Sequence, residues 1–328
     1  MWHRVLTRLA AQTTVVAIDH VTGRPSRRLS RRPAVVLADG HTDLPPTRAP
    51  LVVQVHEAGW FEPALRDTLD PAFLEFISSR TATAVRAAAH VITLSEASRR
   101  DIVAAYAADP RRVHVVNPGL EAPFRPDASG GRATVARARG RPEGPYVLFA
   151  AAVHPRKNLP VLREAMTGLA GEGFPHTLVV AGGAATDRED SSELERAAAA
   201  DLPGAAGRVV RLRDVDDGVL AGLMAEADAF CLPSLHEGFG LTALEAMACG
   251  APVVVSDRGA LPEVVGEAGL VVAPTATEVQ RALRRLLIDP ELSARLGRAG
   301  AERARAFSWD TTAAGWLAVI ARAVAPDG

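Results

Sequence analysis

Lysine is almost absent from this chain: 36 of its 37 basic residues are arginine, and the remaining one is Lys157. Aromatic residues make up only 5% of the sequence, and there are two cysteines, Cys231 and Cys249. Both cysteines fall in apolar stretches, which argues against a disulfide and for small apolar side chains in a reducing compartment. The basic residues are not interleaved with aromatic ones, so no nucleic-acid partner is expected.

Several familiar motifs are also missing. No apolar run approaches the length of a membrane span, and residues 1–11 carry Arg4 and Arg8 where a signal peptide would have an apolar segment. Neither GxGxxG after the first strand nor a Walker loop is present, which argues against a dinucleotide dehydrogenase and a P-loop nucleotidase. His154 and His236 lack metal-ligand spacing to cysteines or acids, so no metal is expected.

The charge that is present is unevenly distributed. Residues 1–142 hold 20 Arg against 13 acids, a net of +7, whereas residues 143–328 hold 17 basic residues against 25 acids, a net of −8. Five arginines lie within residues 24–32: Arg24, Arg27, Arg28, Arg31 and Arg32. At about 1 kcal/mol per basic residue near an anionic leaflet, this cluster predicts docking on the inner face of a membrane. The alternative is a solvated loop in an arginine-rich protein.

The first part of the chain reads as alternating strands and helices, punctuated by Gly, Pro and Asp. Short apolar runs predict buried parallel strands at 13–18, 34–38, 51–55, 91–94 and 113–116. Helices are predicted at 1–11, at 71–89 and at 96–107, the last with Ser95 as its N-cap. A segment rich in Pro, Gly, Ala and Arg follows at 126–144, a composition typical of an interdomain linker.

The second part alternates more regularly. Strands are predicted at 146–151, 177–181, 209–212, 229–232, 253–256 and 269–272, with helices at 159–170, 191–200, 217–225, 241–249 and 277–287. Such alternation predicts a doubly wound parallel sheet that binds ligands at the carboxyl ends of its strands. Closing helices are expected at 290–307 and 310–324.

The stretch 229–263 holds the most informative motif of the chain. Pro233 ends an apolar strand, and Gly238-Phe239-Gly240 is expected to open an amphipathic helix. The unpaired N–H groups at a helix start favour an anion such as a phosphate. Glu237 and Glu245 flank this start, and carboxylates there suit hydroxyl groups, from which they accept hydrogen bonds.

Five motifs in this order resemble the retaining glycosyltransferases of family 4, which have the two-domain GT-B fold. The motifs are VQVHE at 53–57, VITLSEASRRDI at 91–102, VHVVNPGL at 113–120, HPRKN at 154–158 and EGFGLTALEAMACGAPVV from Glu237 onward. The resemblance covers nearly the whole chain. It implies two Rossmann-like doubly wound domains: an acceptor-side domain at 1–125, a linker at 126–144, a nucleotide-sugar-binding domain at 145–307 and a last helix at 308–328 that crosses back to the first domain. Family members usually begin with a strand and a Gly-rich loop ahead of the helix expected at 1–11. The N-terminal domain is therefore expected to be truncated, either because the sequence as given starts late or because the domain lacks its first strand.

The resemblance also implies site residues. Arg156 and Lys157 would clamp the donor diphosphate, Glu237 would bind the sugar hydroxyls and Glu245 the ribose, and His56 would lie at the sugar. The implied catalytic set is Glu237, His56, Arg156 and Lys157, and the implied nucleotide-binding set is Arg156, Lys157, Gly238, Phe239, Gly240, Leu241 and Glu245. The single Lys157 fits such a role, because an ammonium is a compact point charge that a guanidinium does not replace freely.

The function implied is that of a cytoplasmic, metal-independent retaining glycosyltransferase of polysaccharide biosynthesis. Its donor would be a nucleotide sugar, GDP-mannose or a UDP-hexose with mannose favoured, and its acceptor a glycan or lipid-linked glycan. Two alternatives remain open: a non-catalytic nucleotide-sugar-binding protein, which the missing first strand would favour, and a sugar-nucleotide epimerase, which HPRKN together with the two glutamates fits less well.

Overall fold

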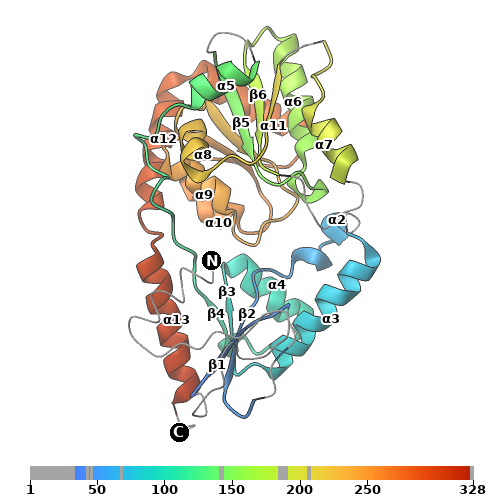
Figure 1. Ribbon diagram of the computed structural model, residues 1–328, viewed down its shortest axis with the longest axis vertical. Coiled ribbons are helices and arrows are strands. Elements are labelled where there is room, and N and C mark those ends of the chain that lie inside the picture. The colour runs from blue at the N-terminus through green and yellow to red at the C-terminus, as the bar shows by residue number, and fades with distance from the viewer. Residues whose placement is uncertain are drawn as a thin grey trace. The chain divides into compact units, whose positions relative to one another are not determined.

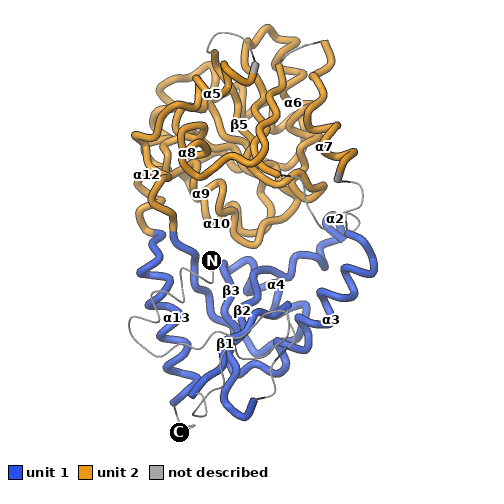
Figure 2. The backbone as a smooth tube through the Cα atoms, viewed as in Figure 1, with its two compact units in different colours: residues 1–119, 307–328 blue, residues 120–306 orange. Residues whose placement is uncertain are grey.

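The computed structural model describes residues 34–41, 44, 47–66, 69–139, 144–183, 191–204 and 208–325. The predicted helix at 1–11, the strand at 13–18 and the five arginines of 24–32 lie outside the described residues. The chain divides into two compact units (Figure 2). Unit 1 comprises Met1–Gly119 and Phe307–Gly328, and unit 2 comprises Leu120–Ala306.

Unit 1 is built on four described parallel strands in the order β1-β2-β3-β4. They are β1 (Val36–Asp39), β2 (Leu51–Gln54), β3 (His90–Thr93) and β4 (Val113–Val115). Successive side chains point to opposite faces of the sheet, so Val52 and Ile92 pack in one apolar cluster with Trp316, and Val53 and Val91 pack in another. Both faces of this sheet are therefore covered, as the continuous apolar runs in the sequence predicted.

The described helices of unit 1 are α2 (Pro63–Arg66), α3 (Pro71–Ala87), α4 (Glu96–Tyr106) and α13 (Trp309–Val324). The predicted N-cap of α4 is confirmed, since the Ser95 side chain accepts a hydrogen bond from the Ser98 N–H at 3.0 Å. Helix α13, drawn in red in Figure 1, contacts β2 and β3, so the end of the chain belongs to unit 1.

Unit 2 contains six described parallel strands in the order β10-β9-β8-β5-β6-β7. They are β5 (Tyr146–Ala150), β6 (Thr177–Ala181), β7 (Val209–Leu212), β8 (Ala229–Leu232), β9 (Val253–Ser256) and β10 (Leu270–Val272), close to the predicted ranges. From β5 the chain builds outward through β6 to β7, then returns to place β8 on the other side of β5. The strand order thus reverses between β5 and β8, the point at which open α/β sheets bind ligands.

The described helices of unit 2 form two groups. Helix α6 (Leu159–Gly171) contacts α11 (Ala276–Ile288), whereas α9 (Leu241–Ala248) contacts α8 (Asp217–Ala225) and α12 (Pro290–Ala304). Figure 1 shows the two groups on opposite faces of the sheet. Helix α7 (Ser191–Ala199) packs on β7, and the short α10 (Leu261–Val265), which the sequence did not predict, follows β9.

The segment 126–144, expected to be a linker, contains helix α5 (Gly131–Arg139) instead. This helix packs on α8, and the Glu226 carboxylate accepts hydrogen bonds from the N–H groups of Gly130 and Arg132, at 2.9 and 2.6 Å. An acid from the end of a distant helix therefore satisfies the orphan donors at the start of α5. Local composition could not reveal this partner.

Neither cysteine is bonded: Cys231 on β8 and Cys249 after α9 are both free and buried. Among the described residues, no helix is both long and apolar enough to span a membrane.

Candidate active site

The HPRKN motif follows β5 at the point where the strand order of unit 2 reverses. It folds as a 3₁₀ turn, Pro155–Lys157, because Pro155 fits the first helical position and His154 Nδ1 accepts the N–H of Arg156 at 3.0 Å. Asn158 then adopts the left-handed conformation (φ 55°) and starts α6. The turn directs two consecutive cations, Arg156 and Lys157, toward the neighbouring loop after β8.

Hydrogen bonds that involve backbone carbonyl groups join this turn to neighbouring loops. The Asn158 side-chain amide donates to the carbonyl oxygens of Pro233 and Pro274, at 3.1 and 3.3 Å. The Leu235 N–H donates to the Arg156 carbonyl at 2.8 Å. Asn158 was not among the predicted site residues, although its place directly after Lys157 in the motif was a signal that could have identified it.

Glu237 is the centre of the arrangement. Its Oε1 accepts from Lys157 Nζ at 2.7 Å and from the Ser234 hydroxyl at 2.6 Å, and its Oε2 accepts from Arg156 at 3.1 Å. Glu237 is only 5% exposed, and the side chains of Arg156 and Lys157 are 22% and 15% exposed. Three of the predicted residues are thus brought into one nearly buried cluster with two positive charges and one negative charge.

The ionisation of Glu237 follows from these contacts. Burial alone would raise the pKa of this carboxyl group, but the charges of Lys157 and Arg156 and the hydrogen bonds from Lys157 and Ser234 outweigh burial and lower its pKa to about 2. Glu237 is therefore a carboxylate throughout the physiological pH range. Such a group can accept hydrogen bonds, but it is not suited to donate a proton.

A glycine allows the Glu237 loop to lie close to the next one. Gly259 follows β9 with a φ of +56°, and a Cβ atom there would lie 2.3 Å from the carbonyl oxygen of Glu237. That carbonyl accepts the N–H of Ala260 at 2.9 Å. Only glycine combines this conformation with this approach. The sequence analysis did not identify Gly259.

Gly259→Ala is expected to lower the free energy of unfolding by roughly 2 kcal/mol or more, because the added methyl group meets backbone and the left-handed conformation is strained. Urea unfolding measures this change. Gly171→Ala is the matched control, since a Cβ at the end of α6 meets nothing within 4 Å. Equal unfolding free energies for the two variants would contradict the close approach described at Gly259.

The helix after Glu237 begins at Leu241, as the predicted range 241–249 has it. Gly238 and Phe239 belong to the loop, and Gly240 is the N-cap of α9 at a φ of 93°. Since glycine has no side chain, no side-chain cap covers the first turn. Phe239 is buried, whereas Leu241 is exposed. The start of α9 thus has the anion-binding character expected of a helix start.

Glu245 lies on α9 and is only 8% exposed. Among the described residues, no side chain donates a hydrogen bond to its carboxyl group. Burial and then the nearby acids Asp217 and Glu121 raise the pKa of Glu245 to about 8. Glu237 and Glu245 therefore differ in ionisation near neutral pH, although both flank the same helix start.

His56 belongs to unit 1, directly after β2, so it lies at the carboxyl edge of that sheet. Its ring packs edge-on against His41, with centroids 6.4 Å apart. Burial lowers the pKa of His56, although Asp39 and Glu57 oppose this effect. Within the described residues its Nε2 is buried and has no hydrogen-bond partner. A buried polar atom without a partner at a ligand-binding edge fits the predicted role of His56.

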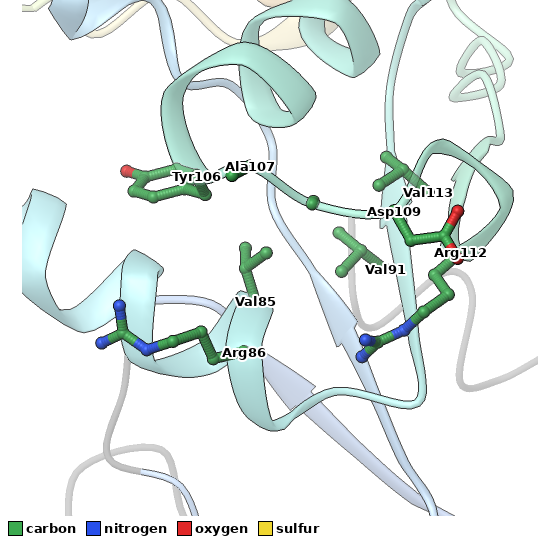
Figure 3. Close-up of a pocket in the computed structure, with 9 residues that line it drawn as sticks. Val85, Arg86, Val91, Tyr106, Ala107, Asp109, Arg112 and Val113 are labelled. Atoms are coloured by element: carbon green, nitrogen blue, oxygen red, sulfur yellow. The ribbon is translucent and has the colours of Figure 1, made fainter.

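A separate hollow of about 160 Å³ lies in unit 1, lined by residues of the ends of α3 and α4 and the start of β4 (Figure 3). None of the predicted site residues lines it. It lies at the amino end of β4, whereas ligands of such sheets bind at carboxyl ends. Among the described residues, no three His, Cys, Asp or Glu side chains are grouped as metal ligands.

Residues 144–289 match the family model described as glycosyl transferases group 1. The chain is 34% identical over 279 residues to the MMP alpha-(1->4)-mannosyltransferase of Mycolicibacterium hassiacum, covering 83% of this chain and 62% of that protein. It is 38% identical over 253 residues to the D-inositol 3-phosphate glycosyltransferase of Acidothermus cellulolyticus, covering 74% of this chain and 55% of that protein. The chain therefore spans less than two thirds of the length of these relatives.

Solved structures show the same fold. Sucrose-phosphate synthase of Thermosynechococcus elongatus superposes with a TM-score of 0.69 at 23% identity, covering 88% of this chain and 73% of that one. HepE of Anabaena in complex with UDP-glucose superposes with a TM-score of 0.67 at 23% identity, covering 84% of this chain and 73% of HepE. The predicted fold class, two parallel-sheet α/β units of the GT-B kind, is confirmed. The chain therefore carries a glycosyl transferases group 1 domain at residues 144–289, as the sequence resemblance predicted.

Proposed function

We propose that this chain is a retaining glycosyltransferase that moves a hexose, with mannose favoured, from a nucleotide-sugar donor to a glycan or lipid-linked glycan. The observation that carries the proposal is the cluster of Arg156, Lys157 and Glu237 at the point where the strand order of unit 2 reverses. The uncapped start of α9 follows Glu237 directly in the chain. Cations and helix N–H groups suit a diphosphate, and a permanently ionised carboxylate suits sugar hydroxyls.

The proposed mechanism assigns each group one task. The nucleoside diphosphate leaves with growing negative charge, and Arg156 and Lys157 stabilise that charge more strongly in the transition state than in the ground state. The N–H groups at the start of α9 bind phosphate oxygens. Glu237 accepts hydrogen bonds from the sugar hydroxyls, and Glu245 accepts them from the ribose. His56 is proposed to contact the sugar.

The proton of the acceptor hydroxyl passes to the leaving phosphate in this mechanism, and the new bond forms on the face that the phosphate leaves. The geometry supports the first part of this assignment, because Glu237 is held by three donors and has a pKa lowered to about 2, so it does not carry the proton. No metal ion has a role in it. The two cations and the helix start supply the positive charge that a metal would otherwise supply.

The donor is proposed from the relatives. The Mycolicibacterium hassiacum relative is named a mannosyltransferase, which favours GDP-mannose, and HepE of Anabaena was solved with UDP-glucose, which keeps a UDP-hexose as the second donor to test.

Docking at the inner membrane face through residues 24–32 remains a proposal, because those arginines lie outside the described residues. Sedimentation with anionic and neutral liposomes, comparing the protein with a variant whose Arg27, Arg28, Arg31 and Arg32 are Gln, tests it.

A ligand screen by thermal shift tests the proposed function. UDP, GDP, UDP-glucose and GDP-mannose are compared with and without EDTA, and a ligand at a hundred times its Kd is expected to stabilise the protein by about 2.7 kcal/mol. A donor-hydrolysis assay follows for each stabilising ligand. Stabilisation without turnover would favour the non-catalytic alternative, conversion of the donor sugar without release of nucleotide would favour the epimerase, and loss of the shift in EDTA would contradict the metal-independent mechanism.

Glu237→Gln is expected to reduce turnover at least a hundredfold while UDP or GDP binds as tightly as before or more tightly. The reason is that the variant replaces the charged acceptor of sugar hydroxyls by a weaker, neutral one, whereas it leaves Lys157 and Arg156 in place with less of their charge neutralised. Isothermal titration calorimetry gives the binding constant, and the hydrolysis assay gives the rate. A variant that loses nucleotide affinity and turnover together would contradict the assignment of Glu237 to the sugar.

A further inference from the structure

The two oxygens of Glu237 are not used equally. Oε1 accepts from two donors, the Lys157 ammonium at 2.7 Å and the Ser234 hydroxyl at 2.6 Å, whereas Oε2 accepts from one donor among the described residues, Arg156 at 3.1 Å. A carboxylate offers about two acceptor positions on each oxygen. The protein therefore fills Oε1 and leaves a position on Oε2 for a further donor.

Ser234 is itself firmly held. Its carbonyl oxygen accepts the hydroxyl of Ser256, at the end of β9, at 2.6 Å, and both serines are completely buried. The residues on either side are fixed as well, because the Pro233 carbonyl accepts from Asn158 and the Leu235 N–H donates to Arg156. The Ser234 hydroxyl thus reaches Glu237 from a backbone that is tied to two neighbouring loops.

We propose that Ser234 is a positioning residue of the donor site, whose hydroxyl holds Glu237 by Oε1 so that Oε2 is presented to a hydroxyl group of the donor sugar. The proposal rests on the proposed function, and it adds a residue to which neither the motifs nor the relatives assign a role. Lys157 and Arg156 are the charged groups that face Glu237, and Ser234 is the one neutral side-chain donor to it among the described residues.

The neutral donor matters because the two cations have a second task. When a diphosphate binds, Lys157 and Arg156 turn part of their hydrogen-bonding capacity to phosphate oxygens. The Ser234 hydroxyl is neutral, so phosphate attracts it less strongly than it attracts the two cations. The hydroxyl therefore keeps its hydrogen bond to Glu237. Without this hydrogen bond, the Glu237 carboxylate moves with the two cations and loses the orientation that the sugar requires. Such a misplacement reduces the rate more than it reduces nucleotide affinity.

Ser234→Ala and Ser256→Ala form a matched pair that tests this proposal. Each removes a completely buried hydroxyl and one hydrogen bond of 2.6 Å, but only Ser234 touches Glu237. The first measurement needs no substrate: the Glu237 carboxyl is titrated by NMR in protein labelled with ¹³C at the glutamate side-chain carboxyl, with Glu237→Gln to assign its signal. Because a hydrogen bond to the charged form lowers a pKa, Ser234→Ala should raise that of Glu237 by about one unit, whereas Ser256→Ala should leave it unchanged.

The second measurement uses UDP and GDP for binding and UDP-glucose and GDP-mannose for turnover. Ser234→Ala is expected to lower kcat by about tenfold to a hundredfold with nucleotide affinity within threefold of the unsubstituted protein, and Ser256→Ala to keep both. Equal Glu237 titrations in the two variants, or an unchanged kcat in Ser234→Ala, would overturn the positioning role. If the unsubstituted protein binds neither nucleotide, the proposed function fails, and the NMR titration still decides whether Ser234 holds Glu237.

Discussion

Lys157→Ala is expected to reduce transfer from the nucleotide-sugar donor by a hundredfold or more. Lys157 Nζ lies 2.7 Å from Glu237 Oε1, and the Lys157 side chain is 15% exposed. A partly buried charge at this position can stabilise the negative charge of a transition state strongly. The substitution also leaves Arg156 as the one cation that pairs with the Glu237 carboxylate among the described residues. The effect should therefore appear in kcat and, more weakly, in the affinity for UDP or GDP.

Lys157→Arg is expected to lose much of the activity as well. The 3₁₀ turn places Lys157 beside Arg156, and both side chains already reach Glu237. A second planar guanidinium cannot occupy the position of a compact ammonium next to the first without displacing one of them. Arg281→Ala is the control, since Arg281 is 67% exposed in the same unit and pairs only with Glu278. Full activity of Lys157→Arg would contradict the inference drawn from the single lysine.

The strands and helices were largely predictable, because local rules govern them. The six strands of unit 2 were placed from apolar runs of four to six residues, and the N-cap at Ser95 was placed from its residue type and position. The start of α9 at Leu241 was placed from its helical spacing, although only the backbone shows that its N-cap Gly240 takes the left-handed conformation. The short helix α10 (Leu261–Val265) was missed, because five residues are too few to show a helical period. Local sequence therefore predicts long elements better than short ones.

The side-chain network was only partly predictable, because it depends on the strand order. The motifs indicated Arg156, Lys157 and Glu237, but the hydrogen bond from Ser256 to Ser234 joins the end of β9 to the loop after β8, which meet only when β8 and β9 pair. The close approach of Gly259 to Glu237 has the same origin. Likewise, Glu226 accepts a hydrogen bond from the N–H of Arg132, which lies 94 residues earlier in the chain, so no local pattern predicted helix α5.

Glu245→Gln is expected to make the protein more stable than the unsubstituted form at pH 8.5 and about equally stable at pH 4.5. The folded-state pKa of Glu245 is raised to about 8 from an ordinary 4.5, so the stability that this group contributes is fully present below pH 4.5 and is lost as the pH rises toward 8. Glutamine resembles the protonated acid and does not titrate. At about 1.4 kcal/mol per pH unit, and with allowance for relaxation of the site, the gain at pH 8.5 is roughly 2 kcal/mol.

Urea unfolding across this pH range measures the effect, with Glu302→Gln as the control, because Glu302 is 72% exposed and pairs with Arg305. Parallel pH profiles of the Glu245→Gln variant and the unsubstituted protein would contradict the raised pKa.

Nucleotide binding should reveal the same proton on Glu245. If ribose hydroxyl groups donate to Glu245, they favour its charged form, so binding of UDP or GDP at pH 7 must release the proton that burial, Asp217 and Glu121 hold in the free protein. Calorimetry in phosphate and in Tris, two buffers with different ionisation enthalpies, should then give different apparent binding enthalpies. In Glu245→Gln the difference should vanish and the affinity should fall by about tenfold, the equivalent of one hydrogen bond to a charged group. A buffer-independent enthalpy in the unsubstituted protein, with clear binding, would mean that Glu245 stays protonated and does not bind the ribose as a carboxylate.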